Sequence, residues 1–155
     1  PGLLEVLDGV QEVMRITEPY KLASRTFKTE NTVVTIGDLR IGGDEVIVMA
    51  GPCSAESEAQ VMSTAAAVRR AGAKVLRGGA FKPRSSPYSF QGMGEDGLKL
   101  LRAAADAHNL KLVSEVMDVS QIELMGRYVD IYQVGARNMQ NFTLLRELGK
   151  VRTPV

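Results

Sequence analysis

Three cations and two adjacent hydroxyl groups lie in one loop-forming stretch, residues 76–92, which reads LRGGAFKPRSSPYSFQG. The stretch contains no Asp or Glu, so Arg77, Lys82 and Arg84 have no acidic neighbour within it. Glycine lets the backbone approach an anion closely, and proline reduces the entropy that a loop loses on binding. The composition therefore predicts a phosphate-binding loop, and a solvated surface loop is the alternative.

Three further polar residues have types that suit the same chemistry. Cys53 follows a Gly-Pro pair, where a thiolate could bind a metal or act as a nucleophile; a small buried side chain is the alternative. Nearby Arg and Lys would lower the pKa of the Cys53 thiol. Glu115 ends an apolar run and is expected to be ionised and paired. Arg137 follows the small residues Gly135 and Ala136, which leave room for a bidentate grip on a carboxylate or phosphate.

The elements that must position these residues follow a strand–helix alternation from residue 46 onward, which is typical of a parallel sheet in an α/β fold. The expected strands are 46–50, 74–77, 110–115 and 131–134, and the expected helices are 57–71, 94–108, 119–127 and 140–149. Each candidate follows or ends one of these strands. Because the carboxyl ends of parallel strands meet at one edge, we expect Cys53, Lys82, Glu115 and Arg137 to converge at a common mouth.

The remaining segments divide the chain into residues 1–31, 32–43 and 44–155. Apolar residues at roughly helical spacing predict a lead-in helix over residues 3–14. Two β-prone runs around Gly37-Asp38 predict a hairpin with a type I′ or bulged turn. The expected helix starts are Ser57, Asp118 and either Asn138 or Asn141, the expected helix ends are Gly72 and Gly149, and a fifth strand is expected to begin at residue 153.

Composition excludes several classes of protein. A chain of 155 residues with 45% apolar content can form one ordinary domain, and its net charge of +1 gives no reason to expect nucleic acid. One cysteine excludes an intrachain disulfide, and no run is long and apolar enough to indicate a membrane span, so we expect a cytoplasmic protein. One Cys and one His also exclude a self-contained Cys/His zinc site, and His108 is not expected in the site.

Several separated motifs together resemble those of 3-deoxy-D-arabino-heptulosonate-7-phosphate (DAHP) synthase, the first enzyme of the shikimate pathway. They are AGPCS at 50–54, LRGGAFKPRS at 76–85, SPYSFQG at 86–92, SE at 114–115 and GARNM at 135–139. The resemblance runs from about residue 19 to the last residue. It implies a (β/α)8 TIM barrel, of which this chain would cover the first four strand–helix units after an N-terminal helix and a hairpin. It also implies a metal-dependent, aldol-like condensation of phosphoenolpyruvate with erythrose 4-phosphate.

The resemblance further implies a role for each matching residue. Cys53 would be a ligand of a divalent metal (Mn, Fe, Co or Zn), and Cys53 and Lys82 would be the catalytic pair. The residues around phosphoenolpyruvate would be Arg77, Lys82, Glu115, Gly135, Ala136 and Arg137. Erythrose 4-phosphate would be bound by Pro83, Arg84 and Ser85. A cluster of cations also makes physical sense there, because it offsets the repulsion between two anionic substrates.

The family's other metal ligands, a His, a Glu and an Asp, belong to later strands, as do a further phosphate-binding Lys and Arg. We therefore expect this chain alone to bind metal poorly and to be inactive. Unpaired strand edges and an uncovered inner face also predict that it pairs with the remainder of the barrel, belongs to a longer chain or forms a homo-oligomer. Two alternative functions stay open: 3-deoxy-manno-octulosonate-8-phosphate synthase, which has an Ala-Asn-Arg arrangement where this chain has Pro83-Arg84-Ser85, and a non-catalytic anion-binding module.

Overall fold

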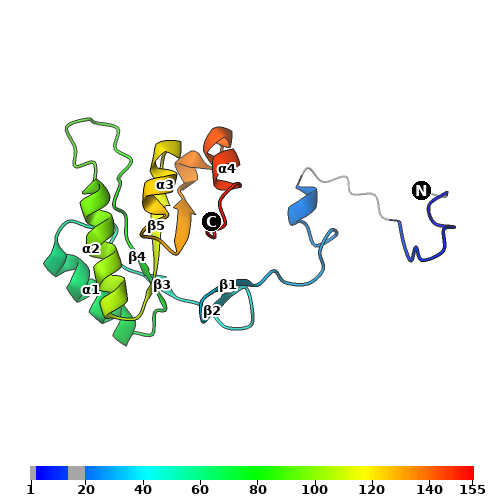
Figure 1. The fold of residues 1–155 in the computed structure, drawn as a ribbon, viewed down its shortest axis with the longest axis horizontal. Coiled ribbons are helices and arrows are strands. Elements are labelled where there is room, and N and C mark those ends of the chain that lie inside the picture. The colour runs from blue at the N-terminus through cyan, green and yellow to red at the C-terminus, as the bar shows by residue number, and fades with distance from the viewer. Residues whose placement is uncertain (1–2, 14–19) are drawn as a thin grey trace.

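The protein is described here by a computed structural model that covers residues 3–13 and 20–155. Its main body is a four-stranded parallel sheet in the order β3-β4-β5-β6, so strands that follow one another along the chain are neighbours in the sheet (Figure 1). The strands are Met49–Ala50, Val75–Arg77, Lys111–Val116 and Ile131–Val134. The helices are α1 (Glu58–Arg70), α2 (Gly94–Ala107), α3 (Ile122–Met125) and α4 (Phe142–Leu148). The alternation confirms the expected α/β fold.

The helices α1 and α4 begin at side-chain caps that the sequence predicts. The Ser57 hydroxyl accepts a hydrogen bond from the Gln60 amide at 3.3 Å, and the Asn141 side chain accepts one from the Leu144 amide at 3.2 Å. Each cap satisfies an amide that the first helical turn leaves without a partner. Asp118 caps a 3-10 turn (Val119–Gln121), so the helix expected over 119–127 is instead this turn followed by the short α3.

Side chains along the strands alternate between two faces of the sheet. One face carries Leu76, Leu112, Val116 and Tyr132, which belong to a buried cluster with residues of all four helices. Figure 1 shows α1 and α2 side by side on this face. Because apolar area removed from water is the main favourable term in folding, this face fixes how the helices lie on the sheet.

The opposite face of the sheet has an apolar half, near the amino ends of the strands, and a polar half, near their carboxyl ends. Near the amino ends of the strands, Val75, Val113 and Ile131 are buried together with Leu39. Leu39 belongs to a hairpin made by β1 (Val34–Ile36) and β2 (Leu39–Ile41), and Ile36, Ile41 and Ile47 also pack here. The hairpin therefore covers the amino half of this face, and the polar residues Arg77, Glu115 and Gln133 occupy the carboxyl half.

The hairpin is present where the sequence predicts it, but its turn is of another type. Ile36 pairs with Leu39, which leaves Gly37 and Asp38 as a two-residue loop. Gly37 has φ +62°, whereas Asp38 is not among the described residues with positive φ. A type I′ turn needs positive φ at both central residues, and a type II′ turn needs it only at the first. The φ pattern is therefore that of type II′, because Gly occupies the first position.

Two sequence expectations are wrong. The helix expected over residues 3–14 is absent from residues 3–13, which form turns, and Met14 lies outside the described residues. The leucines of this segment are exposed, so no packing supports the costly first turn of a helix. The strand expected over 46–50 is limited to Met49 and Ala50, and Val46, Val48 and Met49 are exposed rather than covered on both faces. β3 is an edge strand whose ladder pairs only these two residues with β4.

The last residues continue along the other edge of the sheet. The Tyr132 amide of β6 donates a hydrogen bond to the Pro154 carbonyl at 2.8 Å. This contact lies where the sequence predicts the start of a fifth strand, although residues 151–155 are not assigned to a strand. Within the described residues, no helix combines the length and the apolar character needed to cross a membrane.

The packing of the hairpin can be tested by truncating its central leucine. Leu39→Ala is expected to lower the free energy of unfolding by about 2–5 kcal/mol, because it opens a cavity against Val75, Val113 and Ile131. Urea denaturation measures this change. Thr35→Ala, on the exposed outer face of the same hairpin, is the control and is expected to cost about 1 kcal/mol or less. Equal losses in the two variants would show that the hairpin does not cover the sheet.

Candidate functional site

The loops after β3 and β4 meet at the carboxyl edge of the sheet. The Lys82 ammonium donates a hydrogen bond to the Cys53 carbonyl oxygen at 2.7 Å and lies 3.3 Å from the Cys53 sulfur. A backbone hydrogen bond from the Ala55 amide to the Gly79 carbonyl, at 3.0 Å, joins the same two loops. Residues that are 29 positions apart along the chain are thus held in direct contact.

Lys82 is buried, with only 6% of its surface exposed. Its amide donates to the Gln91 carbonyl at 2.9 Å, which closes the base of the loop between β4 and α2. A Cβ added to Gly79 would lie 2.9 Å from the Cys53 carbonyl oxygen and 3.1 Å from the Lys82 nitrogen. Glycine at position 79 therefore makes the space in which the ammonium reaches Cys53.

Arg77, the last residue of β4, also contacts the Cys53 loop. Its Nη1 donates to the Cys53 carbonyl at 3.3 Å, and its Nε donates to the Gln133 side-chain oxygen at 3.2 Å. Sequence reasoning missed Gln133. Alternation in β6 separates Gln133 from the buried Tyr132, which is a signal in the sequence, but its contact with Arg77 depends on the strand register that only the structure gives.

Glu115 lies against the start of the loop that follows β6. A Cβ on Gly135 would overlap the Glu115 carboxylate, so only glycine fits at this position. The expectation that Glu115 is paired is wrong within the described residues, where its side chain forms no ion pair and no hydrogen bond. Its carboxylate is held by close packing, and its oxygens remain available to a ligand.

Arg137 lies next to the second half of the cation-rich stretch 76–92. Pro83, Arg84, Ser85 and Arg137 together line an open pocket of about 370 Å³. Ala136 and Arg137 belong to a 3-10 turn (Ala136–Asn138) directly after β6. The structure therefore groups Arg137 with the three residues expected to bind erythrose 4-phosphate, while Arg77 and Lys82 cluster around Cys53.

These four cations share one electrostatic property. Among the described residues, no carboxylate lies within ion-pairing distance of Arg77, Lys82, Arg84 or Arg137, although nine other pairs of opposite charge do form. Cations next to one another repel, so their grouping raises the free energy of the empty site and favours an anion. The site is thus suited to hold groups such as phosphate and carboxylate.

The Cys53 thiol is exposed and electrostatically activated. The hydrogen bond from Lys82 and its positive charge, with smaller contributions from Arg77, hold the pKa of the thiol below its usual value. This confirms the expected effect of nearby cations, and the exposure contradicts the alternative of a buried small side chain. A thiolate is a good ligand for a divalent metal. The described residues contain no cluster of three His, Cys, Asp or Glu that could complete a metal site, so they do not form one unaided.

Comparison with protein families gives a match that covers most of the chain. The model of the DAHP synthetase I family matches residues 23–155. A relative from Thermotoga maritima, named phospho-2-dehydro-3-deoxyheptonate aldolase, is 49% identical over 151 residues, which are 97% of this chain and 45% of the relative. A 2-dehydro-3-deoxyphosphooctonate aldolase from Geobacter sulfurreducens is 31% identical over 130 residues, which are 79% of this chain and 48% of the relative. The chain thus spans about half the length of these relatives.

Solved structures agree with the sequence comparison. The crystal structure of the Thermotoga maritima phospho-2-dehydro-3-deoxyheptonate aldolase (DAHP synthase) superimposes with a TM-score of 0.81 at 48% identity, over 96% of this chain and 43% of that one. A truncated form of 3-deoxy-D-arabino-heptulosonate 7-phosphate synthase from the same organism gives a TM-score of 0.72 at 42% identity, over 83% of this chain and 45% of that one. Sequence and backbone therefore point to the same relatives.

The influence of Lys82 on the thiol can be measured directly, because Cys53 is the only cysteine. Lys82→Met removes the hydrogen bond and the charge that lower the pKa of Cys53, and is expected to raise that pKa. The rate of alkylation by iodoacetamide, measured against pH, should then reach half of its maximum at a higher pH than in the unmodified chain. Lys74→Met, before the amino end of β4, is the control. An unchanged midpoint in Lys82→Met would contradict the proposed activation.

Proposed function

Because the chain belongs to the DAHP synthetase I family, we propose that the protein containing it condenses phosphoenolpyruvate with erythrose 4-phosphate, the first step of the shikimate pathway. The reaction joins the two substrates with consumption of water and gives DAHP and inorganic phosphate. The enzyme is of the transferase type. The observation that carries the proposal is the group of four cations at the carboxyl edge of the sheet, which have no carboxylate partner among the described residues.

We assign phosphoenolpyruvate to the inner part of this group. Arg77 and Lys82 flank Cys53, and Glu115 lies against Gly135 on the same face of the sheet. The substrate carries a phosphate and a carboxylate, which match two separate cations better than one. Arg137 and the backbone of Gly135-Ala136 would complete the enclosure from the β6 side.

Erythrose 4-phosphate fits the outer part of the site. Pro83, Arg84 and Ser85 line the open pocket that they share with Arg137, so a guanidinium and a hydroxyl are available for its phosphate. Arg137 lies in this pocket, although the family resemblance assigns it to phosphoenolpyruvate. We propose that Arg137 stands between the two substrates, where one guanidinium can reduce the repulsion between two phosphates.

Cys53 is proposed as one ligand of a divalent metal. Its exposed sulfur and lowered pKa suit such a role, which also implies that the Lys82 ammonium lies close to the bound ion. The described residues supply this one donor and no cluster that could complete a metal site, so we expect weak metal binding by this chain alone. When bound, the metal would polarise the aldehyde or position water.

The sheet is proposed to be the first half of a (β/α)8 barrel. Its strands are parallel and in sequential order, and the Pro154 carbonyl already accepts a hydrogen bond from the last of them. A closed barrel would cover the edges of β3 and β6. We propose that the chain acts together with the remainder of the barrel, as a homo-oligomer in the cytoplasm.

Two alternatives make different predictions. The relatives named 2-dehydro-3-deoxyphosphooctonate aldolase are more distant, at 31% and 34% identity, and do not favour that activity. Lys82-Pro83-Arg84-Ser85 also differs from the Ala-Asn-Arg arrangement expected after the lysine of that family. A non-catalytic anion-binding module would use the same cations but would not respond to a metal.

Calorimetry of phosphoenolpyruvate binding tests the inner site. Arg77→Gln is expected to weaken binding at least about tenfold, because a charge-assisted hydrogen bond is lost. Arg70→Gln, an exposed arginine in the last turn of α1, is the control and should bind normally. Titrations with and without Mn²⁺ separate metal-assisted binding from simple anion capture. Equal weakening in both variants would show that the affinity for phosphoenolpyruvate depends only on the net charge of the chain.

A turnover assay tests whether this chain needs the remainder of the barrel for activity. The 155-residue chain alone is expected to form no DAHP, since a complete metal site is not found among its described residues. A protein that joins it to the remainder of the barrel should accept erythrose 4-phosphate in preference to arabinose 5-phosphate. In that protein Arg84→Gln should raise KM for erythrose 4-phosphate more than KM for phosphoenolpyruvate. Turnover by the isolated chain, or a preference for arabinose 5-phosphate, would contradict the proposal.

A further inference from the structure

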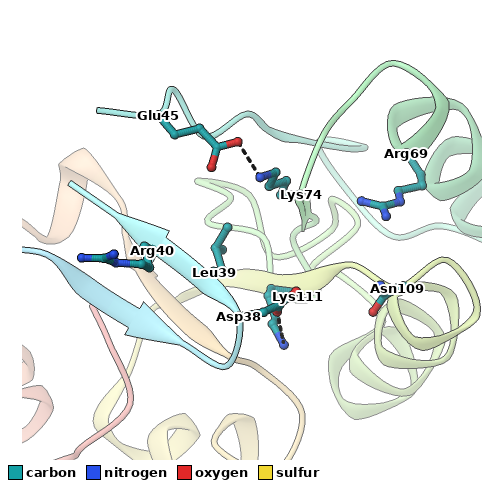
Figure 2. A pocket seen from close by; sticks show the side chains of 8 residues that line it. All are labelled: Asp38, Leu39, Arg40, Glu45, Arg69, Lys74, Asn109 and Lys111. Carbon is teal, nitrogen blue, oxygen red and sulfur yellow. Dashed lines mark hydrogen bonds and ion pairs between the residues drawn. The ribbon is translucent and has the colours of Figure 1, made fainter. Parts of the chain in front are cut away.

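A second charged pocket lies at the opposite end of the sheet, between the hairpin, the end of α1 and the starts of β4 and β5. Its volume is about 230 Å³. Figure 2 shows the side chains that line it, which are Asp38, Leu39, Arg40, Glu45, Arg69, Lys74, Asn109 and Lys111. Four cations and two carboxylates leave this pocket with an excess of positive charge. It has no part in the proposed condensation.

The cations of this pocket come from separate elements and differ in their partners. Lys74 pairs with Glu45, and the Lys111 ammonium lies 3.6 Å from an Asp38 oxygen (Figure 2). Arg69 forms no ion pair and no hydrogen bond through its side chain with any described residue, and its guanidinium points toward the pocket. Arg40 is directed away from the other cations, so it is not part of the inferred site.

The two carboxylates that occupy the pocket are held weakly. Their side chains are 59% exposed in Glu45 and 88% exposed in Asp38. Exposed ion pairs of this kind contribute only about 0–1 kcal/mol, because water competes for both charges. A ligand with two negative charges can therefore displace them at small cost and compete for the two lysines with which they now pair.

We propose that this pocket binds a compact dianion, inorganic phosphate or the phosphate group of a small phosphomonoester. Arg69 offers a planar guanidinium that can bind a phosphate through two hydrogen bonds, and Lys74 and Lys111 add two point charges. Asn109 contributes a side-chain amide at the wall of the pocket. The small volume matches one phosphate group and is too small for a nucleotide.

Occupation of the pocket would join the hairpin to the sheet. The Lys111 ammonium lies over the hairpin turn, since a Cβ on Gly37 would be 2.9 Å from its nitrogen. Leu39, which packs against the sheet, is also part of the pocket wall. A bound phosphate would thus bridge α1, β4 and β5 next to the hairpin that covers the amino half of the inner face. This inference concerns a different end of the sheet and does not depend on the proposed reaction.

Titration of the full chain with inorganic phosphate, followed by 15N–1H NMR, tests the site. Saturable shifts are expected for the amides of Leu39, Arg69 and Asn109, separate from shifts in residues 77–92 that report on the carboxyl edge. Arg69→Gln should weaken the amino-end response about tenfold, and Arg69→Lys should weaken it less. Arg70→Gln is the matched control, because it removes the same charge from the same helical turn without touching the pocket.

Each outcome of the titration either supports or overturns the proposed phosphate site. A weaker amino-end response in Arg69→Gln, with Arg70→Gln unchanged, supports the site whether or not residues 77–92 respond to phosphate. Shifts confined to residues 77–92 would overturn it and leave the proposed function intact. Equal weakening in Arg69→Gln and Arg70→Gln would also overturn it, because the effect would then be due to the general charge of the α1 terminus.

Discussion

The alternation of side chains along β4, β5 and β6 is the constraint on which the rest of the structure depends. Leu76, Leu112 and Tyr132 must face the helices to be buried, so their sequence neighbours Arg77, Val113 and Gln133 must face the other way. A shift of one residue in any of these strands would bury the polar side chains and expose the core. The apolar packing of the helices therefore fixes the direction in which the site residues point.

The buried ammonium of Lys82 gives the site its electrostatic character. Burying a charge is costly unless polar groups surround it, and here the carbonyl and the sulfur of Cys53 serve as its partners. No described carboxylate neutralises it or its neighbours Arg77, Arg84 and Arg137. By contrast, Lys74 and Lys111 at the amino end are paired with acids. The positive charge at the carboxyl edge is therefore available to ligands. At the amino end, Lys74 and Lys111 form weak ion pairs that an anion can displace.

Sequence reasoning failed where a segment depends on contacts with distant parts of the molecule. Helical spacing at residues 3–14 predicted a helix, but the leucines of residues 3–13 are exposed and do not bury an apolar face that would stabilise one. Glu115 was expected to be paired because it ends a buried strand, yet its contact is with the backbone of Gly135. The charged pocket around Arg69 was not predicted, because its residues come from segments that are far apart along the chain and none of these segments has a recognisable motif.

The sequence alone determined the order of strands and helices from residue 46 onward, the capping residues, the position of the hairpin and the set of residues at the carboxyl ends of the strands. These features depend on local periodicity and turn chemistry, which a single chain displays directly. Only the tertiary structure decided which of those residues touch. The contacts of Cys53 with Lys82, of Arg77 with Gln133, and of Arg137 with the Arg84 pocket depend on strand register and on the path of the loops. Such contacts arise from packing between distant segments, and spacing along the chain does not encode them.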